Sequence, residues 1–359
     1  MFCVLTCASA FFLATKEIVA QPGETRTFEE IEKQLKSSLE EINKNFNVNQ
    51  SHSDFYEGRG YIYYRLYENK VSHKGLHDKI YAQNGIADFT KALELADKSY
   101  TPNARNSAKA KILSLRAMLY ETIWQYQVYR IPETSVKIRL KYLFESIDFK
   151  NAVSDYQKAT QLDSETKAHF NSLSRLYEFR AGIFSYSPEL LKEIRSQNKT
   201  DSIWKDFDSA LKYGGQAREK SYSFWATFDI MLKKGKIAFE VGRYDVALDA
   251  YLSDEKYLGK NYQNLCGETR GEFGCDKEKR VFKYTFSFRR ATVYIKLGKP
   301  EKALSEMEVF FANVFHTACP QPFLVRAEAY RQVGKIELAA ADEKKARDLP
   351  PVGHGVCDY

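Results

Sequence analysis

Two histidine–cysteine pairs near the C-terminus carry side chains that can bind zinc. His316 and Cys319 are three positions apart, and so are His354 and Cys357. Imidazole nitrogens and thiolate sulfurs are common ligands of tetrahedral zinc. The spacing is not a strong zinc signature, and the second pair lies in a C-terminal tail, so a zinc site is the alternative interpretation of these residues.

The same region offers disulfides. Cys266 and Cys275 bracket a turn-rich stretch, and we expect them to pair with each other. Cys319 would then pair with Cys357 and hold the tail (351–359) against the last helices. In the loop-entropy model, closing a loop of about 39 residues stabilises a fold by roughly 4 kcal/mol. An even number of cysteines after residue 20 fits an oxidising compartment. Free buried thiols are the third possibility.

The sequence has no motif that indicates catalysis. It contains no glycine-rich phosphate loop, no nucleophile elbow and no His-Glu-x-x-His. The other histidines (His52, His73, His77 and His169) are scattered, and no two acidic residues stand out as an acid–base pair. We therefore expect a protein that is not an enzyme and needs no cofactor.

The N-terminus favours export. The first 15 residues are uncharged, which is shorter than the about 20 residues of a membrane span and suits a secretory signal. Residues 1–20 are predicted to be a signal peptide, and the mature chain to be secreted or periplasmic without a transmembrane segment. No Lys or Arg precedes the apolar run, which would be explained if Met1 is not the true start. The alternatives are a lipid anchor at Cys7 in an envelope membrane and a buried N-terminal helix in a cytoplasmic protein.

The charge distribution argues against nucleic acid as a partner. The formal net charge is +7, but Lys and Arg are interspersed with Asp and Glu. A nucleic-acid-binding protein would concentrate basic residues in a stripe. A mildly basic, solvated surface is the better interpretation.

A recurring sequence motif and a recurring spacing of small and aromatic residues indicate paired helices. The motif Leu/Val-Gly-Lys/Arg begins at Val241, Leu297 and Val333, and the last two are 36 residues apart. First helices carry a small residue and a tyrosine three positions later, as at Gly60 and Tyr63. Second helices carry small, aromatic and small residues, as in Gly85, Phe89 and Ala92 or Ala152, Tyr156 and Ala159. Small residues let two helices approach and a ring fills the space between them, and a period in the mid-thirties is typical of stacked helical hairpins. We predict an all-α fold.

These segments resemble the tetratricopeptide repeat (TPR) family. Residues 85–95 and 151–159 are similar to its second helix, and residues 326–334 to its first helix and turn. The resemblance covers most of residues 55–350 in about six hairpins, with long inserts expected at 68–82, 128–148 and 185–200. One insert contains a helix-like piece, Val136–Ile147. Residues 21–54 are expected to form an amphipathic helix from about Phe28, followed by a polar loop.

The resemblance implies an α-solenoid, a right-handed superhelix whose first helices line a concave groove that binds a protein or peptide. The outward residues of these helices are the groove candidates: Tyr61, Tyr64, Arg65, Lys236, Phe239, Phe288, Thr292, Ile295, Lys296, Glu328 and Arg331. Phe288 and Ile295 could equally be core. A carboxylate clamp of Lys, Asn and Arg is not expected, because Glu57, Tyr61, Ser114 and Met118 occupy matching positions.

The sequence therefore favours a non-catalytic, exported scaffold that binds a protein or peptide through its concave face. Three alternatives remain: a helical periplasmic enzyme, a structural component of the cell envelope, and a glycan-capturing protein. A closed cavity with paired acids would favour the enzyme, and an aromatic-rich surface would favour the glycan-capturing protein.

Overall fold

A computed structural model of the protein describes residues 27–44, 51–75, 77–218, 224–253, 272–314 and 319–349. These ranges contain α-helices and one short 3-10 helix and no β-strand, so the predicted all-α class is confirmed. The chain divides into two units, one made of residues 1–180 and 209–221, the other of 181–208 and 222–359. The predicted signal (1–20) and tail (351–359) lie outside the described residues.

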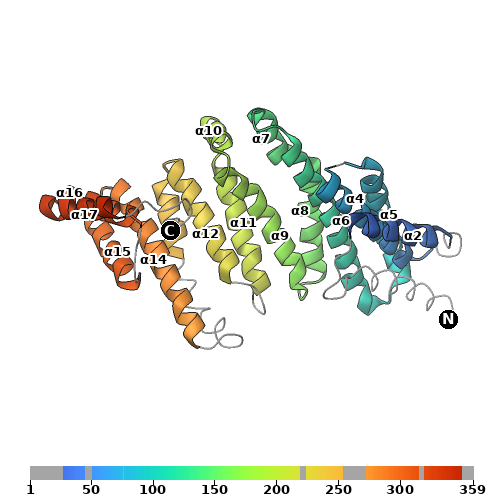
Figure 1. Ribbon diagram of the computed structural model, residues 1–359. Coiled ribbons are helices and arrows are strands. Elements are labelled where there is room, and N and C mark those ends of the chain that lie inside the picture. Colours follow the sequence, from blue (N-terminus) through green and yellow to red (C-terminus); the bar gives the residue numbers. More distant parts are fainter. Residues whose placement is uncertain are drawn as a thin grey trace. The chain divides into compact units, whose positions relative to one another are not determined.

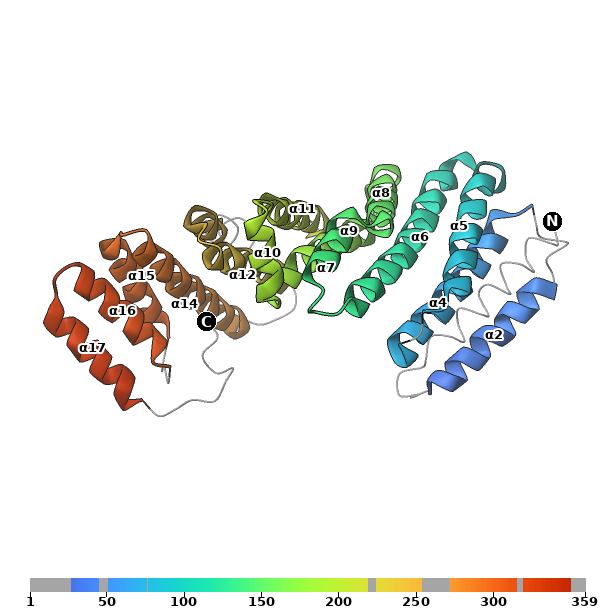
Figure 2. The same ribbon diagram turned by 90° about the horizontal axis from the view of Figure 1, so that it is seen from above.

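Unit 1 is a row of antiparallel helices (Figures 1 and 2). Helix α2 packs on α4, α4 on α5, α5 on α6, and α6 on α8, while the short helix α7 lies against α6 and α8. Helix α2 begins at Phe28, where the sequence predicted it. The bounds are α2 (Phe28–Lys44), α4 (Ser53–Lys74), α5 (Lys79–Ser99), α6 (Pro102–Arg130), α7 (Val136–Glu145), α8 (Ile147–Leu162) and α9 (Lys167–Gly182).

Unit 2 repeats the hairpin pattern (Figure 2). Helix α14 packs on α15 and α16, and α16 on α17. Helix α11 (Asp201–Arg218) contributes to both units. The other elements are η1 (Ile183–Ser185), α10 (Pro188–Ser196), α12 (Phe224–Glu240), helical residues 244–253, α14 (Glu272–Lys296), α15 (Pro300–Asn313), α16 (Gln321–Gln332) and α17 (Ile336–Asp348). Within the described residues, no helix is both long and apolar enough to cross a membrane.

Small residues and rings meet inside the hairpins, as their spacing predicted. A Cβ atom on Gly60 would lie 3.0 Å from the ring of Phe89, which is fully buried. A Cβ atom on Gly235 would lie 2.1 Å from Cε1 of Tyr251. At Gly235 the two helices therefore approach more closely than a side chain permits, and at Gly60 a methyl group would fit only if the ring of Phe89 shifted slightly. In both places the facing ring fills the space.

The recurring Leu/Val-Gly-Lys/Arg motif forms a helix C-cap. Gly242, Gly298 and Gly334 all have positive φ, a conformation that glycine adopts without the clash of a Cβ atom. In each turn the residue after the glycine donates its N–H to the carbonyl five positions back, as Arg243 does to Ala238 at 2.8 Å. The glycine N–H bonds three positions back, which completes a Schellman motif. The motif therefore ends each first helix and sets the direction of the second.

Two of the three expected inserts are present. Helix α7 (Val136–Glu145) lies within 128–148, and α10 (Pro188–Ser196) lies within 185–200. The expected insert at 68–82 was wrong, because α4 continues to Lys74 and α5 starts at Lys79. Gly75 caps α4 in the left-handed conformation, and the side chain of Asp78 caps α5 while pairing with Lys70 at 2.7 Å. This tight connection needs no further residues.

Four first-helix arginines in the described ranges repeat one contact. Each precedes the small residue of its helix and binds a carboxylate on the second helix through Nε and Nη2. The distances are 2.7 and 2.7 Å for Arg59 on Asp88, 2.7 and 2.9 Å for Arg116 on Asp155, 2.8 and 2.9 Å for Arg290 on Glu306, and 2.7 and 2.8 Å for Arg326 on Asp342. Bidentate geometry of this kind is among the stronger forms of a protein ion pair.

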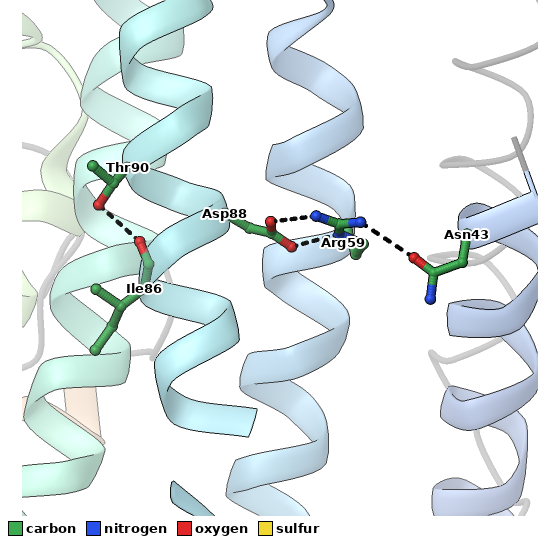
Figure 3. A network of polar contacts seen from close by, with 5 residues as sticks. All are labelled: Asn43, Arg59, Ile86, Asp88 and Thr90. Atoms are coloured by element: carbon green, nitrogen blue, oxygen red, sulfur yellow. Dashed lines mark hydrogen bonds and ion pairs between the residues drawn. The ribbon is translucent and has the colours of Figure 1, made fainter. Parts of the chain in front are cut away.

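The same arginines also touch the preceding helix. Arg59 donates from Nη1 to Asn43 of α2 at 3.2 Å (Figure 3), and Arg116 to Thr90 of α5 at 2.9 Å. Arg290 donates to the carbonyl of Tyr251 at 3.1 Å. The guanidinium of Arg326 lies 4.0 Å from the ring centroid of Phe311, in cation–π geometry. Each arginine therefore joins the two helices of its own hairpin and the helix before it.

Candidate binding surface on helices α4, α6 and α9

The first helices of unit 1 are neighbours. Helix α4 packs on α6, and Lys111 of α6 reaches Glu57 of α4 at 2.6 Å. Ser114 of α6 lies 2.6 Å from Nδ1 of His169 on α9. Side chains that are at least partly exposed follow these three helices, and we define them as the first-helix surface: Tyr61, Arg65, Glu68, Met118, Glu121, Thr122, Gln125 and Arg175.

On α4 this surface contains a tyrosine–arginine–glutamate cluster. Arg65 donates to the hydroxyl of Tyr61 at 3.3 Å and pairs with Glu68 at 3.2 Å. Tyr64 is buried in the core of unit 1 and donates its hydroxyl to Glu68 at 2.8 Å. Burial, followed by the charge of Glu68, raises the pKa of Tyr64. Of the three candidates on α4, Tyr61 and Arg65 are therefore accessible. Tyr64 is buried and contributes through its hydrogen bond to Glu68, the partner of Arg65.

At the centre of the surface lies a carboxylate bonded to neutral donors. Glu121 on α6 accepts from the hydroxyl of Tyr156 at 2.9 Å and from the amide of Gln125 at 3.0 Å. Burial raises the pKa of Glu121, and Tyr156, the charge of Arg175 and Gln125 oppose this only in part. A carboxylate held in this way costs stability when it is ionised, which is common at functional sites.

Replacing Glu121 by glutamine tests this cost. The raised pKa means that the folded protein binds a proton more tightly than the unfolded chain, so wild-type stability falls as pH rises from the unfolded value of about 4.3 through the raised pKa. Glu121→Gln is expected to lack this decrease and to be more stable than wild type at pH 7, by about 1.4 kcal/mol for each unit by which the pKa is raised. Urea unfolding at a series of pH values measures it. A variant less stable than wild type at neutral pH would show that the ionised carboxylate stabilises the fold.

At the N-terminal ends of the same helices a second carboxylate is buried. Glu57 pairs with Lys111, and its other oxygen lies 3.5 Å from the hydroxyl of Tyr100. Burial raises the pKa of Glu57, although the charge of Lys111 opposes the change. Lys111 itself is more than half exposed, so its ammonium lies where a ligand could reach it.

The Ser114–His169 contact is the nearest approach to a catalytic pair. A hydroxyl bonded to an imidazole can become a nucleophile when a third group orients the ring. Here Asp163 accepts from Thr166 and Ser107 instead. In the described part of the chain no carboxylate hydrogen-bonds His169, and burial lowers the pKa of this histidine. The geometry therefore suits a neutral, structural histidine.

The candidates in unit 2 are divided between surface and core. Lys236 and Lys296 are exposed, and Phe239 packs on Tyr244. Phe288 is buried against Phe310, Ile295 packs on the same cluster, and Thr292 donates to the carbonyl of Phe288 at 2.9 Å. Glu328 and Arg331 pair with each other on α16, and Arg331 also pairs with Glu343 of α17.

Most of the residues predicted to form disulfides or a zinc site lie outside the described ranges. Cys319 is buried and disulfide-bonded, and its partner is a cysteine whose side chain is not described. The pairings of Cys266 with Cys275 and of Cys319 with Cys357 stay predictions. His316, His354 and Cys357 of the zinc alternative also lie outside the described ranges, and the described residues contain no cluster of three potential metal ligands.

Comparison with known proteins gives structural neighbours only. No protein-family model matches the sequence, and no curated protein matches it. A tetratricopeptide repeat protein from Parabacteroides merdae is 14% identical over 97% of this chain and 96% of its own, with a TM-score of 0.32. The P58(IPK) TPR domain is 14% identical over 98% and 95%, with a TM-score of 0.26. A monomeric mutant of IFIT1, solved with Gppp-AAAA, is 12% identical over 96% and 76%, with a TM-score of 0.25.

At these identities and TM-scores the neighbours do not identify a binding partner. The fold is therefore described from the helices of this chain alone. Small residues nest against rings, Schellman turns end the first helices at Gly242, Gly298 and Gly334, and successive helices pack antiparallel. The chain is an all-α protein built from antiparallel helical hairpins with TPR-like packing.

Proposed function

We propose that unit 1 binds an extended polypeptide segment on the first-helix surface and acts as a non-catalytic scaffold. The observation that carries this proposal is the surface of α4, α6 and α9, which places an accessible tyrosine ring, a thioether and both signs of charge on three adjacent helices. Tyr61 and Met118 would supply apolar anchors, and Arg65, Glu121 and Arg175 would fix the register through charged contacts. Rigid helices present such groups at fixed spacing, which lowers the entropy lost on binding.

A selected peptide tests this proposal. A peptide is first isolated from a random displayed library with the whole chain as bait, and its affinity is measured by fluorescence polarisation. Tyr61→Ala, Met118→Ala and Arg175→Ala are each expected to weaken binding, and the strongest of them by at least about tenfold, because a few residues usually carry most of the energy of an interface.

The second-helix surface supplies matched controls. Lys91 and Glu94 on α5 are exposed and, among the residues that the structure describes, pair with each other at 2.9 Å, so Lys91→Ala and Glu94→Ala should leave the affinity unchanged. Binding that resists all three substitutions on the first helices, or that is lost in the α5 variants, would contradict the proposal. Circular dichroism confirms that each variant is folded.

The compartment is part of the same proposal. The disulfide at Cys319 supports an oxidising environment, and we propose an exported protein in which Cys357 is the partner of Cys319. Thiol titration of the mature, unreduced chain should detect no free thiol, whereas Cys357→Ser should expose one. A free thiol at Cys357 in the unreduced wild-type chain would contradict this pairing.

A further inference from the structure

One end of unit 1 gathers exposed apolar side chains. Five large apolar residues of unit 1 are exposed in the described ranges, and four of them (Ile80, Tyr129, Ile138 and Ile147) lie where α4 and α6 end and where α5 and α8 begin. Each of these four is between 63% and 67% exposed. Helix α7, which follows α6, also lies at this end (Figure 1). We name it the α7 end.

Local contacts hold this end together. The hydroxyl of Tyr126 on α6 donates to the carbonyl of Gly75 at 2.7 Å, and its ring stacks on His77 at 5.3 Å. Leu140 and Leu143 anchor the inner face of α7 and are buried. The outer face of α7 consists of residues 137, 138, 141 and 145, which lie on one side of the helix at its 3.6-residue period. Ile138 is therefore exposed because α7 buries its other face.

Cations surround the exposed apolar side chains. Lys79, Arg130, Lys137, Lys141 and Lys150 are exposed at this end, against the exposed acids Glu133 and Glu145. The four lysines form no ion pair with any described residue, and Arg130 lies only over the ring of Tyr126 at 5.8 Å. Isolated apolar residues on a surface need no explanation, but four of them protruding at one end among five cations form a pattern.

We infer that the α7 end docks on an anionic lipid surface. Lysine and arginine attract acidic headgroups, isoleucine side chains enter the boundary between headgroups and acyl chains, and tyrosine prefers the same interface. The four apolar side chains protrude separately from the ends of helices. A planar lipid surface can receive separate protruding side chains, whereas a protein partner would need a matching pocket for each one.

Vesicle co-sedimentation of the whole chain tests this inference. Phosphatidylcholine vesicles with phosphatidylglycerol are expected to bind the protein, and phosphatidylcholine vesicles alone to bind it at least about tenfold more weakly. High salt should release the protein, because exposed charges are screened. Removal of two cations in Lys137→Ala/Lys141→Ala is expected to weaken binding about 30-fold, at the usual contribution of one lysine. Ile138→Ser/Ile147→Ser should also weaken it by at least about tenfold.

Helix α17 carries matched controls. Ile336 and Leu338 are exposed apolar residues, and Lys344 and Lys345 are exposed cations. Ile336→Ser/Leu338→Ser and Lys344→Ala/Lys345→Ala should bind vesicles as the wild type does. The inference is overturned if acidic vesicles do not bind at low salt, if the α7 variants bind as well as wild type, or if the α17 variants lose binding equally. Binding to soluble polyglutamate but not to vesicles would identify an acidic polypeptide as the partner and would also overturn it.

Discussion

Gly235→Ala is expected to destabilise unit 2 by about 3 kcal/mol, because overpacking a well-packed core costs up to about that much. The new Cβ atom would lie 2.1 Å from the ring of Tyr251, which is almost fully buried and packs on Phe286. The ring cannot turn away without opening the contact between α12 and residues 244–253. In calorimetry the unfolding transition of unit 2 should fall by roughly 10 °C.

Gly182→Ala is the matched control within unit 2. Gly182 lies in right-handed helical conformation at the end of α9, and a Cβ atom there meets only the side chain of Lys233 at 3.9 Å. Alanine is a better helix former than glycine by about 1 kcal/mol, so this variant should be as stable as wild type or slightly more stable. If Gly235→Ala were equally stable, the close approach at Gly235 would be refuted.

Arg290→Met is expected to cost about 3–5 kcal/mol, the usual effect of breaking a buried ion pair by removing one partner. The side chain of Arg290 is only 5% exposed and makes four described hydrogen bonds, to both oxygens of Glu306, to the carbonyl of Tyr251 and to Ser287. Methionine keeps most of the volume but leaves Glu306 charged without its partner. Urea unfolding of the full chain measures the change.

Two further variants separate the ion pair from simple packing. Arg290→Met/Glu306→Gln removes both charges and should recover part of the loss, which a double-mutant cycle reports as a coupling energy. Arg243→Met breaks an exposed pair with Asp245, in which the side chains are 44% and 68% exposed, and should cost less than about 1 kcal/mol. An Arg290→Met effect no larger than that of Arg243→Met would show that the repeated arginine contact contributes little.

Much of the fold could be predicted because it depends on local patterns. The turn at each recurring motif requires a left-handed backbone, which favours glycine, and the small and aromatic residues of a hairpin occur at fixed helical spacing. Both features can therefore be recognised in the sequence. The repeated arginine contact was not predicted. Arg59 and Asp88 are 29 positions apart and Arg290 and Glu306 only 16, so no single spacing connects them. A charged residue next to the small position also looks like any other charge on a helix.

The candidate surface was only partly predicted, because it depends on which helices are neighbours. Tyr61 and Arg65 were identified on α4, but Glu121 and Arg175 were not. Glu121 becomes notable only because Tyr156 of α8 and Arg175 of α9 lie beside it, and no spacing in the sequence shows this. With respect to a carboxylate clamp, α9 differs from α4 and α6. Asn171 and Arg175 occupy the matching positions on α9, although Glu57 and Tyr61 on α4 and Ser114 and Met118 on α6 still lack the required Lys, Asn and Arg.

Hydrogen–deuterium exchange with a library-selected peptide tests the central claim most directly. Exchange of the full chain is compared with and without saturating peptide, and helix by helix. We expect protection to concentrate on α4, α6 and α9 and to disappear in Met118→Ala, while α5 and α8 exchange as in the free protein. Protection confined to α5 and α8, or no protection in a complex that forms, would contradict binding at the first-helix surface.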